Sequence, residues 1–138
     1  MTAPAHTLSV SVERDPGTVY RYVSDPRNLP AWAPGFAMAV REDPGGWVVE
    51  TAGGTVRIAF VADNTLGVAD HRVTDDQGSS TLNPMRVIAN GQGAEVLFTL
   101  FQPPDIADDQ FQRDLGLVKS DLQTLKRVLE AEERESQV

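Results

Sequence analysis

The first third of the chain changes from an alternating pattern of apolar and polar residues to two short helical patterns. Residues 8–12 alternate, and this period of two predicts a half-buried strand. Asp15-Pro16 follows, with residue types that favour the N-cap and first position of a helix. The apolar spacing over 19–23 predicts a short helix. The proline-rich segment 28–35 predicts a second helical turn that cannot extend far.

The middle of the chain again alternates between apolar and polar residues. Turns rich in glycine, aspartate and asparagine interrupt it, which is typical of antiparallel strands. The predicted strands are 36–41, 47–51, 56–62, 69–74, 80–90 and 96–100. Pro84 falls inside the segment 80–90. Because proline has no N–H to donate to a ladder, its position predicts a sheet edge or a bulge.

The C-terminal segment, from about Ile106 to Glu133, repeats its apolar residues at helical spacing. The resulting stripe consists of Phe111, Leu115, Val118, Leu122, Leu125 and Leu129. Its burial would contribute on the order of 10 kcal/mol as an upper estimate, so the stripe must be covered. The sheet made by the same chain is the only partner available. Gly116 interrupts this helix and either makes room for a ligand or a strand or is merely tolerated.

These elements predict an α+β architecture. A curved antiparallel sheet of about seven strands would carry two short helices, and the long C-terminal helix would pack across its concave face. A sheet bent around a helix leaves space for a ligand between them, and concave apolar sites of this kind are usual binding sites.

Size and composition predict one domain, residues 1–138, with a frayed tail at 135–138. The absence of cysteine excludes disulfides, thiolate zinc sites and a cysteine nucleophile. The net charge of −8 argues against nucleic-acid binding and against anionic membrane surfaces. Many of the acidic residues, Asp114 among them, lie in the C-terminal segment, where a solvated helix face or a docking surface for a basic partner is expected.

Several other classes of site and location are also disfavoured. His6 and His71 are far apart in sequence, and the chain has no nucleophile elbow, phosphate loop or dinucleotide fingerprint. We therefore predict neither a metal nor a cofactor. No apolar run reaches the roughly 20 residues of a membrane span, and the first residues carry no basic leader. A cytoplasmic location without membrane insertion is the expectation.

The order of elements, together with a set of local motifs, resembles the START-like (helix-grip, SRPBCC) superfamily over nearly the whole chain. The resemblance is in particular to the small bacterial proteins grouped with polyketide cyclases and dehydrases. The residues that carry the resemblance are Val12 with Pro16, Val19, Tyr20 and Val23; Asp25-Pro26 with Asn28-Leu29-Pro30 and Trp32; Asp70-His71; Pro84-Met85-Arg86; Asn90-Gly91 with Gly93; and Leu122, Leu125 and Leu129. The resemblance implies a helix-grip fold with a cavity between the sheet and the final helix. Function does not follow from fold, because this superfamily hosts carriers, receptors and enzymes alike.

Alternation and helical spacing select the side chains expected around such a cavity. The candidate ligand-binding residues are Trp32, Phe36, Trp47, Phe60, His71, Met85, Arg86, Phe98, Phe111 and Leu115. His71 is also the candidate catalytic acid or base, since an imidazole titrates near neutral pH. The alternative is a structural histidine bonded to a neighbour. Arg86 would turn inward if Pro84 forms a bulge; otherwise it is an outward arginine paired with a surface carboxylate.

Three functions are compatible with these patterns. The first is a binding module for a hydrophobic or aromatic small molecule, with His71 and Arg86 at its polar end. The second is a cyclase- or dehydrase-type enzyme in which His71 moves a proton and Arg86 stabilises an enolate. The third is an interaction protein with a filled core. Apolar residues on the outer sheet face, at 59, 61, 97 and 101, add a homodimer as an option.

Overall fold

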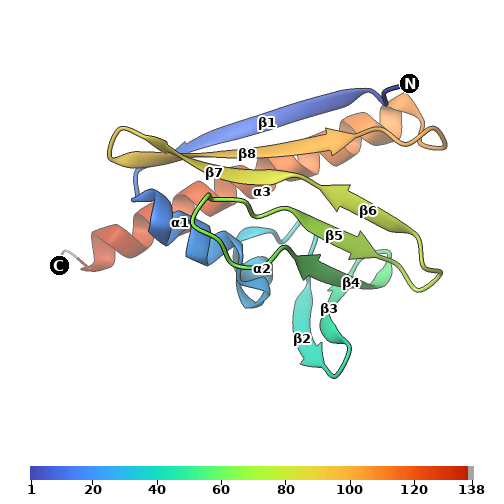
Figure 1. Cartoon of the computed structure of the whole chain (residues 1–138), viewed down its shortest axis with the longest axis horizontal. Helices are drawn as coiled ribbons and strands as arrows, with labels where there is room; N and C mark the ends of the chain where they lie inside the picture. The colour runs from blue at the N-terminus through green and yellow to red at the C-terminus, as the bar shows by residue number, and fades with distance from the viewer. Residues whose placement is uncertain (137–138) are drawn as a thin grey trace.

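Two antiparallel sheets curve around one side of a long helix (Figure 1). The structure, a computed structural model, describes residues 1–136 and the side chains of residues 1–132. The strands are β1 Ala5–Val12, β2 Ala39–Asp43, β3 Gly46–Thr51, β4 Gly54–Phe60, β5 His71–Thr74, β6 Ser80–Asn83, β7 Met85–Asn90 and β8 Gly93–Phe101. The helices are α1 Pro16–Val23, the 3₁₀ turn η1 Pro26–Asn28, α2 Leu29–Trp32 and α3 Asp108–Ser136.

Pro84 divides one predicted strand between the two sheets. The strand orders are β1-β8-β7 and β2-β3-β4-β5-β6, so β6 and β7 each lie at an edge, as the proline predicted. The segment before β5 joins the sheets, because Ala69 N–H donates to Met85 O at 2.9 Å and Val87 N–H donates to Gly67 O at 2.8 Å. The part of the chain that the structure describes therefore has eight strands where about seven were expected.

The short N-terminal helices form as their sequence predicts. The Asp15 carboxylate accepts a hydrogen bond from Thr18 N–H at 3.0 Å and caps α1, which begins at Pro16. This helix buries Val19 and Val23. The brief α2 turn buries Leu29 and Trp32 against the same core.

The predicted strand at 36–41 begins later than expected. Phe36 N–H and Ala37 N–H donate to Ala33 O at 3.0 and 2.9 Å, which continues the turn that leaves α2. The chain therefore becomes extended only at β2. Met38, two residues after Phe36, is 65% exposed.

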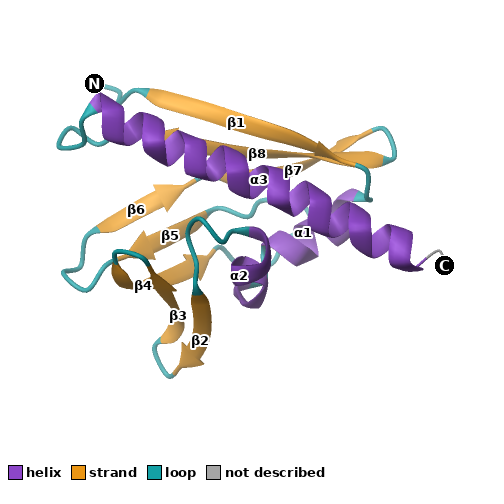
Figure 2. Ribbon diagram, turned by 180° about the vertical axis from the view of Figure 1, so that it is seen from behind, coloured by secondary structure: helices purple, strands orange, loops and turns teal. Residues whose placement is uncertain are grey.

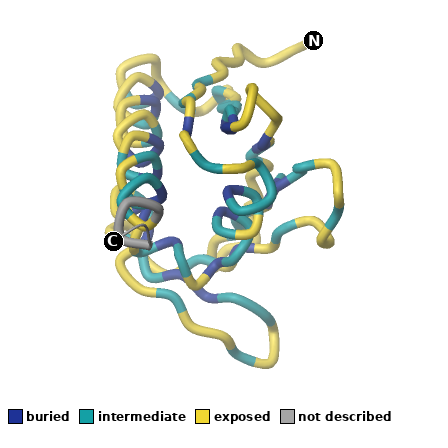
Figure 3. The backbone as a smooth tube through the Cα atoms, turned by 90° about the vertical axis from the view of Figure 1, so that its left-hand side faces the viewer, coloured by how far each residue is buried: buried dark blue, intermediate teal, exposed yellow. Residues whose placement is uncertain are grey.

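The apolar stripe of α3 is buried, as predicted. Leu122, Leu125 and Leu129 are at most 2% exposed, and Phe111 and Leu115 are each 7% exposed. Figure 2 shows α3 lying across β1, β8 and β7, and in Figure 3 its buried positions face the rest of the molecule. The helix continues through Ser136, so residues 135 and 136 of the expected frayed tail are helical, whereas 137 and 138 lie outside the described residues. None of the helices within residues 1–136 is long and apolar enough to cross a membrane.

Gly116 lies on the exposed side of α3, and neither a strand nor the cavity approaches it. A Cβ added at this glycine would meet no atom within 4 Å. Because glycine costs about 1 kcal/mol relative to alanine inside a helix, Gly116→Ala is expected to raise the free energy of unfolding by about that amount. Urea denaturation followed by circular dichroism measures this change. An unchanged or lower stability would mean that the glycine has a role that its surroundings do not show.

Candidate ligand-binding site

A cavity of about 380 Å³ lies between α3, α2 and the inner face of the strands. This size falls within the range of small-molecule pockets. Its lining residues are Leu29, Trp32, Ala33, Gly35, Phe36, His71, Val73, Thr81, Asn83, Phe98, Leu100, Phe101, Pro103, Ile106, Phe111, Asp114, Leu117, Val118 and Asp121. The predicted unfilled space beneath the helix is therefore present, and the interior is not filled by side chains as the third hypothesis requires.

A second, wider depression of about 1040 Å³ lies between α1 and the loop that joins β4 to β5. It opens broadly to solvent, and none of the predicted site residues lines it. The smaller cavity under α3 has a more apolar lining and contains predicted site residues, so it is the candidate site.

Half of the predicted ligand-binding residues line the cavity. These are Trp32, Phe36, His71, Phe98 and Phe111. Four other predicted residues do not line the cavity. Met85 and Leu115 are buried, Trp47 packs against the core from a half-buried position, and the Phe60 ring lies 4.8 Å from the His71 ring. Strand alternation identified the inward face of the sheet, but it did not show how far the cavity extends along it.

His71 is held as a neutral imidazole on the sheet side of the cavity. Its Nδ1 lies 3.1 Å from Ala69 O, and since a carbonyl only accepts, Nδ1 carries the proton. Nε2 then presents a lone pair, which Asn83 Nδ2 approaches at 3.5 Å. Burial disfavours the charged form and lowers the pKa of His71 below its usual 6.5. The ring also contacts Phe98 edge-on, with centroids 5.7 Å apart. His71 therefore offers a weakly used acceptor to the cavity.

The expectation that Arg86 turns inward is wrong. Its side chain is 51% exposed, and its guanidinium makes a two-bond ion pair with Asp70, with Nε and Nη2 donating at 3.0 and 2.9 Å. The same Asp70 carboxylate accepts the Met85 N–H at 2.9 Å. These bonds hold the pKa of Asp70 below its usual range, with the Arg86 side chain as the largest cause. Pro84 switches the chain between sheets rather than making a bulge that would reorient Arg86.

Asp121 is the most unusual lining residue, and sequence reasoning did not identify it. The residue is 6% exposed, and its Oδ1 accepts the Gly35 N–H at 3.0 Å. Burial raises the pKa of Asp121 above its usual 3.8. Asp114, assigned to a solvated face from its sequence, also lines the cavity. Asp114 lies three residues after Phe111, and Asp121 lies ten residues after it. On a helix these spacings place both aspartates beside the apolar stripe, as a helical projection of the sequence would have shown.

The mouth of the cavity lies where β8 leads into α3. Phe101 and Leu117, both lining residues, are 45% and 49% exposed. Of the apolar residues expected to support a dimer, Phe101 belongs to this mouth and Val61 is 45% exposed. Dimerisation stays a prediction. Within the described residues, no group of three or more histidine, aspartate or glutamate side chains is arranged to hold a metal ion.

Comparisons with known proteins agree with the fold. No protein-family model matches the sequence, and no curated protein matches it. Among solved structures, XoxI from Bacillus cereus is 15% identical, with a TM-score of 0.71 over 91% of this chain and 94% of that one. A START superfamily protein from Mycobacterium smegmatis is also 15% identical, with a TM-score of 0.63 over 92% and 97% of the two chains. The AHSA1-like protein from Rhizobium etli is 18% identical, with a TM-score of 0.65 over 92% and 82%.

Proposed function

The chain has a START-like helix-grip fold, and we propose that it binds a hydrophobic or aromatic small molecule in the cavity beneath α3. The observation that carries this proposal is the partly open cavity of about 380 Å³, whose lining is mostly apolar. The apolar atoms that line this space lack the packing contacts that the rest of the core has. A ligand restores those contacts.

The walls suit an apolar ligand with one polar end. Aromatic residues from α2, β8 and α3 line the space, among them Trp32, Phe98 and Phe111. Polar groups are few, as expected of a specific pocket. The polar groups available to that end are His71 and Asn83 on the sheet side and Asp114 and Asp121 on α3, whereas Arg86, expected to contribute, does not line the cavity.

The enzyme alternative requires both His71 and Arg86 at the cavity, and only His71 lines it. His71 retains a lone pair on Nε2 that suits a proton acceptor, and its lowered pKa keeps it neutral at pH 7. Arg86, expected to stabilise an enolate, is paired with Asp70 and does not line the cavity. Binding therefore has the stronger support, and a reaction at His71 stays a prediction.

Filling the cavity tests the proposed function. Val118 lines the cavity from α3, and Val118→Trp would place an indole ring in the space that the ligand needs. We expect the affinity for the neutral fluorescent probe N-phenyl-1-naphthylamine to fall by about tenfold or more, which corresponds to roughly 1.4 kcal/mol. The increase in probe fluorescence on titration measures this affinity.

Val128→Trp is the matched control. Val128 is a half-buried residue of the same helix that does not line the cavity, so this variant is expected to bind the probe like the wild type. Equal losses in the two variants, or no probe binding to the wild type, would contradict the proposal.

A further inference from the structure

The charged groups around the cavity all have one sign. Its titratable lining residues are Asp114, Asp121 and His71, and none of the described lysine or arginine side chains lines it. Because burial lowers the pKa of His71 and so favours its neutral form, the two aspartates decide the charge of the site. An apolar cavity with only carboxylates would repel a fatty acid or another anionic amphiphile.

Asp121 is a buried carboxylate with an unfilled bonding site. Buried carboxylates are usually paired with a cation, yet the single partner of Asp121 in the described part of the chain is the Gly35 N–H on Oδ1. Oδ2 has no protein partner and is not sealed off by protein atoms. Because Asp121 lines the cavity, this oxygen is available to a ligand inside it.

The other polar groups also mainly accept hydrogen bonds. His71 Nε2 presents a lone pair, and Asp114 adds a second carboxylate whose Oδ1 already accepts Gln110 Nε2 at 2.9 Å. Asn83 and Thr81 can donate as well as accept. The indole N–H of Trp32 is a donor, but it is enclosed by protein atoms and has no partner. A ligand that donates hydrogen bonds satisfies this lining best.

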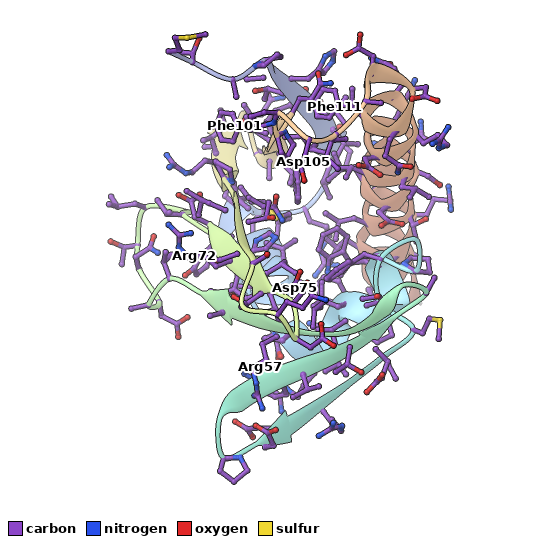
Figure 4. All side chains as sticks on the ribbon, turned by 90° about the vertical axis from the view of Figure 1, so that its right-hand side faces the viewer. Arg57, Arg72, Asp75, Phe101, Asp105 and Phe111 are labelled. Atoms are coloured by element: carbon purple, nitrogen blue, oxygen red, sulfur yellow. The ribbon has the colours of Figure 1, made fainter. Side chains whose placement is uncertain are left out.

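The surroundings favour a cation in two further ways. Aromatic faces attract cations, and Trp32, Phe36 and Phe111 belong to the same lining. In Figure 4, Asp105 lies with Phe101 and Phe111 at the start of α3, whereas Arg57 and Arg72 lie on the five-stranded sheet away from this group. The net charge of −8 also raises the local concentration of cations.

We propose that the cavity selects apolar or aromatic amines, with the protonated nitrogen bound to Asp121 and the hydrocarbon part enclosed by the aromatic wall. This inference rests on the proposed function and specifies the chemical class of its ligand. Binding of the cation would give the Asp121 carboxylate the charged partner that the protein alone does not supply.

Three probes that share one ring system separate the effect of charge from that of shape. These are 1-naphthylmethylamine, the neutral 1-naphthylmethanol and the anionic 1-naphthoate, each titrated calorimetrically at pH 7. The wild type is expected to bind the amine about tenfold more tightly than the alcohol, and the naphthoate most weakly, because a charge-assisted bond is roughly twice as strong as a neutral one.

Isosteric variants locate the charge. Asp121→Asn is expected to remove the preference for the amine while binding the alcohol as the wild type does, which also shows that the variant is folded. Asp109→Asn is the control, because Asp109 lies on the same helix, is 77% exposed and does not line the cavity. It should keep the preference.

The outcomes distinguish the two proposals. Equal binding of amine and alcohol by the wild type, blocked by Val118→Trp, would overturn the amine preference and leave the binding function standing. Loss of the preference in Asp114→Asn but not in Asp121→Asn would overturn the assignment to Asp121. Failure of all three probes to bind would count against the binding function itself.

Discussion

Gly67→Ala is expected to destabilise the protein by about 3 kcal/mol or more, a large part of a typical stability of 5–15 kcal/mol. Gly67 has a φ of +73°, in the left-handed region that costs a residue with a Cβ roughly 1–2 kcal/mol. The added Cβ would also overlap the carbonyl oxygen of Val87. Relieving this overlap would break the bond from Val87 N–H to Gly67 O, at a further cost of about 1–3 kcal/mol.

Gly78→Ala provides the control for backbone conformation. Gly78 has a similar φ of +86°, and a Cβ there would meet no atom within 4 Å. This variant is expected to lose only about 1–2 kcal/mol, the cost of the left-handed conformation. Urea denaturation followed by tryptophan fluorescence measures both values. Equal losses in the two variants would show that the close approach to Val87 does not matter, and that the two sheets are joined mainly by other contacts.

The fold could be predicted from the sequence because its signals are local and repeated. The stripe on α3 is defined by six residues with helical spacing, and the Asp15-Pro16 cap has a direct physical meaning. The error at Phe36 arose where two local tendencies compete. Alternation favoured a strand, but Phe36 N–H and Ala37 N–H satisfy the Ala33 carbonyl and extend the preceding turn.

The site was harder to predict because it depends on where two elements meet. Alternation correctly placed His71 and Phe98 inward, but it could not show which residues of each strand reach the open end of the cavity. Asp121 has the composition of a surface residue. Its burial follows from the loop after α2, which brings Gly35 within 3.0 Å of its carboxylate across a separation of 86 residues. No local pattern contains that contact.

The orientation of Arg86 also depends on a contact that is distant in the sequence. Its partner Asp70 lies 16 residues earlier, immediately before His71. Adjacent residues of an extended segment face opposite sides, so the side chains of Asp70 and His71 point away from each other. The same rule places Asp70 on the outer face, where it can receive Arg86 from β7. The inward orientation of Arg86 depended on a bulge, and the structure has a change of sheet in its place.

Asp70→Ala is expected to destabilise the protein by about 2–3 kcal/mol. The variant would leave the Met85 N–H without its acceptor. Because Met85 is fully buried, this loss costs about 1–3 kcal/mol. Loss of the partly exposed ion pair with Arg86 would add less than about 1 kcal/mol. Arg86→Ala removes only the ion pair, so its loss should remain below about 1 kcal/mol. A larger loss in Arg86→Ala than in Asp70→Ala would contradict this role of the aspartate.

Asp70→Asn separates the charge from the hydrogen bond, because the amide oxygen can still accept the Met85 N–H. The pKa of Asp70 is lowered from 3.8 in the folded protein, so the unfolded chain binds its proton first as the pH falls. The charge therefore contributes stability that is fully present well above pH 3.8 and is lost as the pH falls through the lower folded value. We expect the stability difference between the wild type and Asp70→Asn to be constant from pH 5 to 7 and to shrink towards pH 3. A difference that grows on acidification would show that the Asp70 carboxylate is not stabilised by Arg86 in the folded protein.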